Sequence, residues 1–340
     1  MSIEIDGVDK RIGLALSGGG FRAAAFHLGT FRKLHDLKIL NKIDVFSCVS
    51  GGSIAGAFLC SRWGNAEEID GALDELETYL RTRSIAVSSF IGGALNPFGT
   101  RLDALASSYD THLFDGGTLA SLKNGPRIYI NSTNLSTGNM FFYVAGGEGL
   151  EEMGEHELGQ TSASDQKIST AVAASSAFPP VFPPLYVSEA DYPNNETEYV
   201  TLTDGGVYDN LGVNPLMRVE RNRIDYALIS DGGKPFEISH APTESGSKVL
   251  LEAIGILMEQ VRGLQFQRME LAHAAGRGPL PMWFSIDSHD GQINSGDAAF
   301  ASSIGTNLKR LTDAEMDVLT RHAGALCEAR INKWAPKLLA

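Results

Sequence analysis

Residues 46–56, FSCVSGGSIAG, contain a serine at the point where an apolar run gives way to small residues. A serine that ends a buried strand and is followed by glycine is typical of a nucleophile held at a sharp turn between a strand and a helix. Ser50 meets the G-x-S-x-G pattern of such turns, except that Cys48 stands at the first glycine. Ser53 fits less well, because Ala55 stands at its last glycine. Ser50 is therefore the candidate nucleophile, with an ordinary structural turn as the alternative.

A glycine-rich loop occupies the centre of residues 14–29, LALSGGGFRAAAFHLG, between a predicted strand and a predicted helix. Gly18, Gly19 and Gly20 allow the backbone to approach a ligand closely, with amide hydrogens near the positive end of the helix dipole. Such a loop can bind a phosphate, or it can form an oxyanion hole that stabilises a tetrahedral intermediate.

The same glycines fit a dinucleotide-binding pattern, because Gly18, Gly20 and Ala23 satisfy G-x-G-x-x-A after a strand. That pattern also needs an acidic residue at the C-terminal end of the next strand, where it holds a ribose. Here Asp44 opens the next strand and Ser50 ends it. The position of the acid disfavours a dinucleotide site, and a nucleotide- or phosphate-binding α/β protein remains an alternative.

An acidic residue stands at a similar corner in residues 201–216, TLTDGGVYDNLGVNPL, where Asp204 follows an apolar strand and precedes two glycines. A serine hydroxyl needs a base to take its proton. Asp204 could act as that base directly, or it could orient a histidine as in a triad. His289 is the candidate histidine, because it follows a predicted strand and comes after Asp204. Asp231, in a second Asp-Gly-Gly sequence, is an alternative acid.

The elements that position these residues alternate between strand and helix from the start of the chain. Strands are predicted at 11–17 and 43–50, each followed by a helix, and this order predicts a parallel sheet with right-handed crossovers. Later strands are predicted at 127–135, 139–145, 198–206, 224–233 and 282–287. Helices are predicted from Phe21 and at 54–63 and 66–83, with long amphipathic helices at 244–275 and 311–331. Thr312 and Glu315 fit a capping box.

The segment 84–100, SIAVSSFIGGALNPFGT, is apolar, rich in glycine and without a helix cap. It is interpreted as a packed loop, with a lid as the alternative.

The composition bounds the class of protein. Hydrophobic residues make up 43% of the 340 residues, which is enough for a sizeable core. The formal net charge of −13 argues against nucleic acid as a partner. No stretch reaches the length of a membrane-spanning helix and no signal region opens the chain, so we expect a cytoplasmic protein. The three cysteines are too scattered for a disulfide framework or a zinc site: Cys48, Cys60 and Cys327.

Four motifs occur in the order that patatin-like phospholipases have them. They are the glycine-rich loop with Arg22, the VSGGS run, ASSAFPPVFPP at 174–184 and the Asp-Gly-Gly sequence at Asp204. The chain resembles a bacterial-type member of that family, and SGGGFRA is also similar to the loop of the cytosolic phospholipases that share the fold. The motifs fall within 12–216, and 217–340 resembles the family only in general pattern.

The resemblance implies an α/β fold with three layers, α/β/α, a mainly parallel central sheet and the serine on a strand-to-helix elbow. It implies one acyl hydrolase domain over 1–340, in which 217–340 completes the sheet and its packing helices. A Ser–Asp dyad replaces the triad in this family, so Ser50 matches the nucleophile and Asp204 the base.

The remaining site residues follow from the same resemblance. The oxyanion hole matches Gly18, Gly19, Gly20 and Gly51, and Arg22 matches a position whose guanidinium can meet a substrate phosphate. The implied function is hydrolysis of a phospholipid or lysophospholipid ester without metal or cofactor, with transient, peripheral contact at a membrane surface. A non-catalytic lipid-binding protein of the same fold is the second alternative, and the sequence makes no prediction of oligomeric state.

Overall fold

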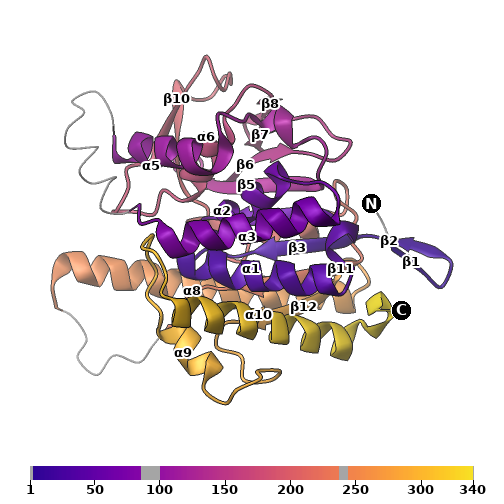
Figure 1. The fold of residues 1–340 in the computed structure, drawn as a ribbon. Helices are drawn as coiled ribbons and strands as arrows, with labels where there is room; N and C mark the ends of the chain where they lie inside the picture. The colour runs from indigo at the N-terminus through magenta and orange to yellow at the C-terminus, as the bar shows by residue number, and fades with distance from the viewer. Residues whose placement is uncertain (1–2, 86–99, 237–243, 340) are drawn as a thin grey trace.

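A computed structural model describes residues 3–85, 100–236 and 244–339, and its centre is a ten-stranded sheet (Figure 1). Five neighbouring strands are parallel: β12 (Leu280–Ser285), β11 (Tyr226–Asp231), β3 (Ile12–Leu16), β4 (Ile43–Val49) and β5 (Arg127–Asn134). Antiparallel strands extend the sheet beyond β5: β6 (Met140–Ala145), β7 (Glu152–Glu155), β8 (Gly159–Ser162), β9 (Leu185–Ser188) and β10 (Tyr199–Asp204). A separate hairpin joins β1 (Ile3–Ile5) to β2 (Val8–Lys10).

Every residue of β3 and β4 is buried, which explains why apolar residues predominate in both strands. All seven strands predicted from the sequence are present, with ends shifted by a few residues. Glycine-rich corners follow β3, β4 and β11, and they lie at one edge of the sheet because these strands are parallel. A further corner follows the antiparallel strand β10.

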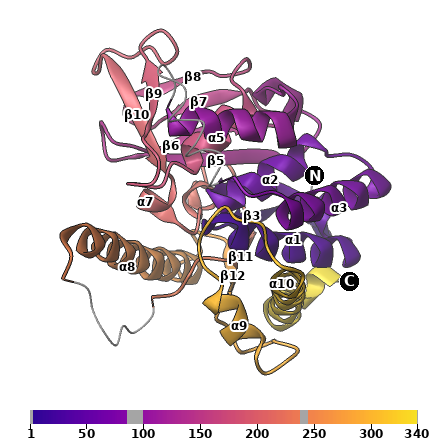
Figure 2. The same ribbon diagram turned by 60° about the vertical axis from the view of Figure 1, so that its left-hand side comes forward.

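Helices cover both faces of the sheet, which confirms the three-layer α/β/α architecture. Figure 2 shows α8 (Gly246–Ala274) and α10 (Asp313–Trp334) on opposite sides of β11 and β12. The larger core lies under α1 (Gly20–Asp36), α2 (Gly51–Ser61), α3 (Ala66–Thr82) and α10. A second cluster includes Leu211, Val213 and Met269 on the side of α8. Shorter helices are α5 (Arg101–Tyr109), α6 (Ile168–Ser175), α7 (Gly206–Asp209) and α9 (Asp297–Ser303).

Helix α10 packs closely along α1. The contact requires glycine at position 29, since a Cβ there would lie 2.6 Å from the Cα of Thr320. The predicted capping box of α10 is confirmed: the Thr312 side chain accepts from the Glu315 amide, and the Glu315 side chain accepts from the Thr312 amide.

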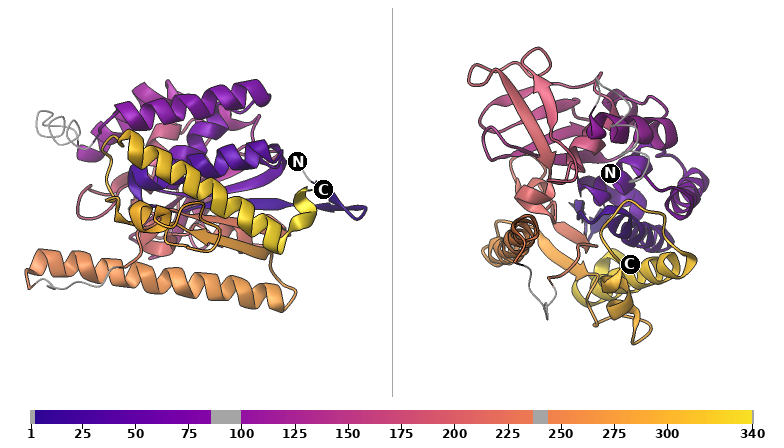
Figure 3. Two further views of the ribbon diagram at one scale, coloured as in Figure 1. Left: turned by 60° about the horizontal axis from the view of Figure 1, so that its bottom comes forward. Right: turned by 90° about the vertical axis from the view of Figure 1, so that its left-hand side faces the viewer.

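Helix α8 departs from the expected amphipathic pattern. Its buried contacts with the body include Arg262 and Met269, and the end that follows the grey segment extends beyond the sheet (Figures 1 and 3). A row of leucines seven residues apart lies on the opposite side of the helix, with 57–71% of each exposed: Leu250, Leu257, Leu264 and Leu271. The apolar residues of α8 therefore do not form one face packed into the core.

Two further predictions are a packed loop or lid at 84–100 and the lack of a membrane-spanning helix. Residues 86–99 of that segment, on which the choice between loop and lid depends, lie outside the described residues. None of the helices in the described ranges combines the length and the hydropathy needed to cross a bilayer.

Candidate active site

A cavity of about 550 Å³ opens where the glycine-rich corners meet. Ser50 and Asp204 both line it, together with the glycines of the loop after β3. Its other walls are largely apolar and come from distant parts of the chain: Phe178, Val181, Phe182, Leu251, Met258 and Leu308. The structure thus brings together a serine, a carboxyl group and a glycine-rich loop at one end of an apolar cavity, which is the form expected of a ligand site.

Ser50 occupies the sharp turn between β4 and α2. Its backbone angles, φ 50° and ψ −112°, lie in a region that residues with a side chain rarely adopt. Such a conformation costs on the order of 1–3 kcal/mol and persists only where the surroundings hold it in place. Two of those surroundings are close backbone approaches: a Cβ on Gly51 would lie 2.9 Å from the Gly20 nitrogen, and one on Gly52 would lie 2.6 Å from the Leu16 carbonyl carbon.

The cysteine that departs from the elbow pattern fits beside a glycine of the next helix. Cys48 is fully buried. A Cβ on Gly56 would lie 2.5 Å from the Cys48 sulfur, so the space for the larger residue comes from the absence of a side chain at position 56. The substitution at the first glycine of the pattern therefore leaves the turn at Ser50 in place.

Asp204 reaches Ser50 because of the register of three strands. Strand β4 ends at Val49, which pairs with Asn131 of β5. Strand β10 runs antiparallel to β5 and ends at Asp204, which pairs with the next residue, Ser132. Since β6 occupies the other edge of β5, β10 pairs with the same edge as β4, and its C-terminal end lies next to the end of β4. Ser50, which follows β4, and Asp204, which ends β10, are therefore neighbours.

The carboxyl group of Asp204 is buried, lines the cavity and has a raised pKa. Burial raises its pKa from the ordinary value of 3.8 to about 7, while the neighbouring Gly206 amide and Ser50 side chain act to lower it. The Gly206 nitrogen lies 2.7 Å from Oδ1. A general base is most effective when its pKa lies near the working pH. The strand register and the shared cavity place this carboxyl group close to Ser50, whose hydroxyl would lose the proton.

The amides of the glycine loop are not equivalent. The Gly18 N–H donates to the Asn210 carbonyl at 3.1 Å, so it is occupied. Within the described residues, no acceptor takes the amides of Gly19, Gly20 or Gly51. Gly19 and Gly20 have φ of 141° and 61°, conformations that favour glycine. Of the four predicted oxyanion-hole residues, Gly19, Gly20 and Gly51 have amides that are available to donate to a ligand. The Gly18 amide instead anchors the loop to Asn210.

Arg22 lies behind the glycine loop instead of facing the cavity. It is fully buried. Its Nε and Nη2 donate to the Gly232 carbonyl at 3.1 and 3.0 Å, and its Nη1 donates to the Ile304 carbonyl at 2.8 Å. These bonds tie α1 to the loop after β11 and to the segment before α10. They support a positioning role for Arg22, and the contact with a substrate phosphate stays a prediction.

Replacing Arg22 with lysine is expected to lower stability and to reduce turnover of a phospholipid and of a neutral short-chain ester by the same factor. A lysine cannot reproduce three directed bonds to two carbonyls, and losing bonds from a charged donor costs about 3 kcal/mol or more. Thermal unfolding and the two turnover rates measure this, with Arg32→Lys, a half-exposed position of the same helix, as the control. A selective loss on the phospholipid would favour direct phosphate contact.

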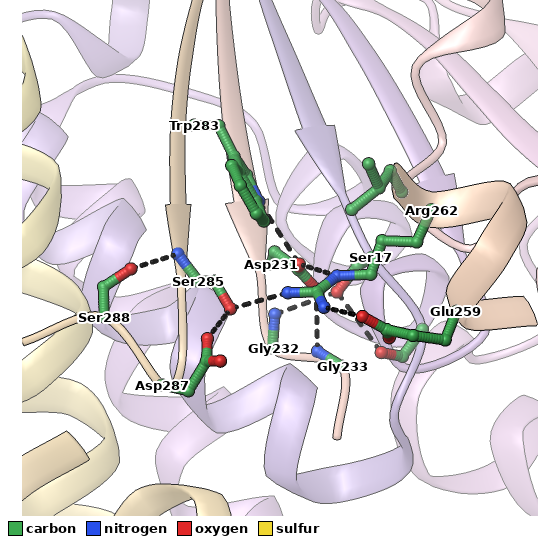
Figure 4. Close-up of polar contacts among 12 residues, drawn as sticks. Ser17, Asp231, Gly232, Gly233, Glu259, Arg262, Trp283, Ser285, Asp287 and Ser288 are labelled. Carbon is green, nitrogen blue, oxygen red and sulfur yellow. Dashed lines mark hydrogen bonds and ion pairs between the residues drawn. The ribbon is translucent and has the colours of Figure 1, made fainter. Parts of the chain in front are cut away.

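The alternative acid, Asp231, is engaged elsewhere, as Figure 4 shows. Its Oδ2 accepts from Arg262 Nε at 2.6 Å and from Trp283 at 3.2 Å, and its Oδ1 accepts from the Gly233 amide at 3.0 Å. Arg262 also donates to Glu259 at 2.7 Å. Asp231 therefore anchors α8 against the end of β11, and Arg262 and Glu259, but not Asp231, line the cavity.

His289 and Asp44 also lie away from the cavity. His289 is exposed and bonds to Gln292 at 3.3 Å, so it does not line the site as a triad histidine would. Asp44 is buried at the start of β4, where it accepts from the Ile12 amide at 2.8 Å. His289 is therefore not placed to assist Ser50, and Asp44 is not placed to hold a ribose beside the glycine loop.

Ser175 is a residue near the site whose role the sequence does not predict. It lies at the end of α6, inside the ASSAFPP run, and its hydroxyl accepts from the Ser50 amide at 2.9 Å. The ASSAFPPVFPP run is one of the four motifs shared with the family and so indicates that this segment matters. The sequence of the run does not indicate which of its serines contacts the turn at Ser50.

The family model of patatin-like phospholipases matches residues 14–217. The chain belongs to this family, and membership supports a lipid acyl hydrolase activity. No match was found among the curated proteins.

Two solved structures of human GIVD cytosolic phospholipase A2 share the fold. One is 14% identical, with a TM-score of 0.61, and the match covers 97% of this chain and 60% of that one. The other, in complex with methyl gamma-linolenyl fluorophosphonate inhibitor and terbium chloride, is 13% identical with a TM-score of 0.59, covering 97% and 59%. The chain thus spans about three fifths of the human structures, and at these identities the likeness concerns the fold alone.

Proposed function

We propose that this protein is a serine lipid acyl hydrolase that works through a dyad of Ser50 and Asp204. The observation that carries the proposal is the placement of a serine at a strained turn beside a buried carboxyl group whose pKa is raised to about 7, at one end of an apolar cavity. The single acyl hydrolase domain over residues 1–340 belongs to the same proposal.

In the proposed mechanism, Asp204 accepts the hydroxyl proton as Ser50 Oγ attacks the ester carbonyl. The amides of Gly19, Gly20 and Gly51 donate to the oxyanion, and removing one such donor costs about 3–4 kcal/mol of transition-state stabilisation. Asp204 then gives the proton to the leaving alcohol. A water molecule, deprotonated by Asp204, attacks the acyl-enzyme, and the fatty acid leaves as the proton returns to Ser50.

The walls of the cavity suggest the substrate class. Aromatic and aliphatic side chains such as Phe178, Phe182 and Met258 suit an acyl chain. Lys234 and Arg262 line the same cavity and suit the polar part of a phospholipid or lysophospholipid. The proposal includes transient contact with a membrane surface, for which the exposed leucine row of α8 supplies apolar area.

Release of fatty acid from lysophospholipid, diacyl phospholipid and a neutral short-chain ester tests this function. We expect release from at least one phospholipid class, and the same product profile with and without an acceptor alcohol. Transfer of the acyl group to the alcohol would redefine the enzyme as an acyltransferase. A protein that binds lipid micelles without releasing fatty acid would be a lipid-binding member of the fold, and the proposal would be wrong.

A further inference from the structure

A buried hydroxyl stands directly behind the nucleophile. Ser175 is fully buried at the end of α6. Its Oγ donates to the Asn131 carbonyl of β5 at 2.6 Å and accepts from the Ser50 amide at 2.9 Å. Ser53 Oγ lies 2.8 Å from it and must be the donor, because the single proton of Ser175 is directed to Asn131. One hydroxyl therefore joins β5, the elbow and the first turn of α2.

The same short segment also holds the base. The Gly205 amide donates to the Ser175 carbonyl at 3.3 Å, and the Asp204 amide donates to the Ala177 carbonyl at 3.2 Å. The Thr203 hydroxyl donates to the Ala177 carbonyl at 2.8 Å. Residues 175–177 thus contact the backbone on both sides of the proposed proton transfer.

We infer that Ser175 is a positioning residue, which sets the distance and direction between Ser50 and Asp204. The inference rests on the proposed function and adds to it a residue that touches neither substrate nor the reacting atoms. At the strained turn of Ser50, the Ser50 amide has no hydrogen-bond partner within the helix. The Ser175 hydroxyl accepts this hydrogen bond and so helps to hold the turn. The Ser175 and Ala177 carbonyls hold the backbone at Gly205 and Asp204. Residues 175–177 therefore position both Ser50 and Asp204.

Replacing Ser175 with alanine is expected to lower kcat by about 10²-fold, since misplacement of a reacting group by about 1 Å has an effect of this size. KM should change little, because Ser175 does not line the cavity. Ser169→Ala is the matched control: Ser169 is a buried serine of the same helix whose hydroxyl donates to Asp110 at 3.1 Å. Rates are taken per folded molecule, from circular dichroism and thermal unfolding.

A second variant keeps the test decisive if the alanine variant does not fold. Ser175→Cys keeps the shape of the side chain and a weaker hydrogen-bonding group, so we expect kcat between those of the alanine variant and the wild type. Equal rates per folded molecule in the wild type and the Ser175 variants would overturn the inference, as would a change confined to KM. A wild type that releases no fatty acid would instead refute the proposed function, so the two failures are distinguishable.

Discussion

Replacing Ser50 with alanine is expected to reduce ester turnover by about 10⁴- to 10⁶-fold, because the variant has no nucleophile and only binding and the oxyanion donors remain. The fold should persist, since the strained turn is held by the Ser50 amide and its neighbours and not by the hydroxyl. Turnover of the best ester substrate, measured beside the thermal unfolding midpoint, checks both parts.

Ser61→Ala is the control for this prediction, because Ser61 ends the same helix and its hydroxyl only caps the Phe58 carbonyl at 2.7 Å. Its turnover should equal that of the wild type. A Ser50→Ala protein that keeps wild-type turnover would place the chemistry elsewhere. If the protein instead binds a nucleotide, the Ser50 variant would keep its affinity for the nucleotide and the wild type would hydrolyse no ester.

Replacing Asp204 with asparagine is expected to reduce turnover by about 10³- to 10⁴-fold, because an amide cannot accept the Ser50 proton. The wild-type rate should rise with pH through about 7, where Asp204 ionises. The residual rate of the asparagine variant should show no step there. A pH–rate profile of kcat/KM for both proteins measures this, and a step near pH 7 retained by the variant would assign that ionisation to another group.

The same substitution should stabilise the protein at alkaline pH. The pKa of Asp204 is higher in the folded protein than its ordinary value of 3.8, so its stabilising contribution is present below 3.8 and is lost as pH rises to about 7. A shift of this size corresponds to roughly 4 kcal/mol. The asparagine variant has no charge to bury, so its unfolding midpoint should exceed that of the wild type above pH 7 and approach it near pH 4. A lower midpoint at pH 8 would contradict the assigned burial cost.

The parts of the site that the sequence could predict are local. A strand, a glycine-rich corner and a helix follow one another within about 15 residues at Gly18 and again at Ser50, and such units have recognisable residue patterns. The seven strands and the capping box at Thr312 were predictable for the same reason.

The parts that could not be predicted depend on contacts between distant segments. The proximity of Asp204 to Ser50 follows from the antiparallel register of β10 on β5, which no local pattern specifies. The burial of Arg22 depends on carbonyls at Gly232 and Ile304, more than 200 residues away. The occupied amide of Gly18 depends on Asn210 in the same way.

Helix α8 shows a different limit. Its leucines recur at helical spacing, which predicts a helix correctly, but spacing alone does not say which face is buried. The ion pair of Arg262 with Asp231 orients the helix, and it leaves the row from Leu250 to Leu271 in solvent. The buried ion pair, and not the pattern of apolar residues, therefore determines which face of α8 packs against the sheet.

Fluorophosphonate labelling followed by peptide mapping tests the central claim most directly, because the reagent reacts with a serine that a base activates at an oxyanion hole. The account predicts one adduct, on Ser50, that disappears in Ser50→Ala and is strongly slowed in Asp204→Asn. A folded wild-type protein without an adduct on Ser50, or labelling that persists in Ser50→Ala, would contradict it.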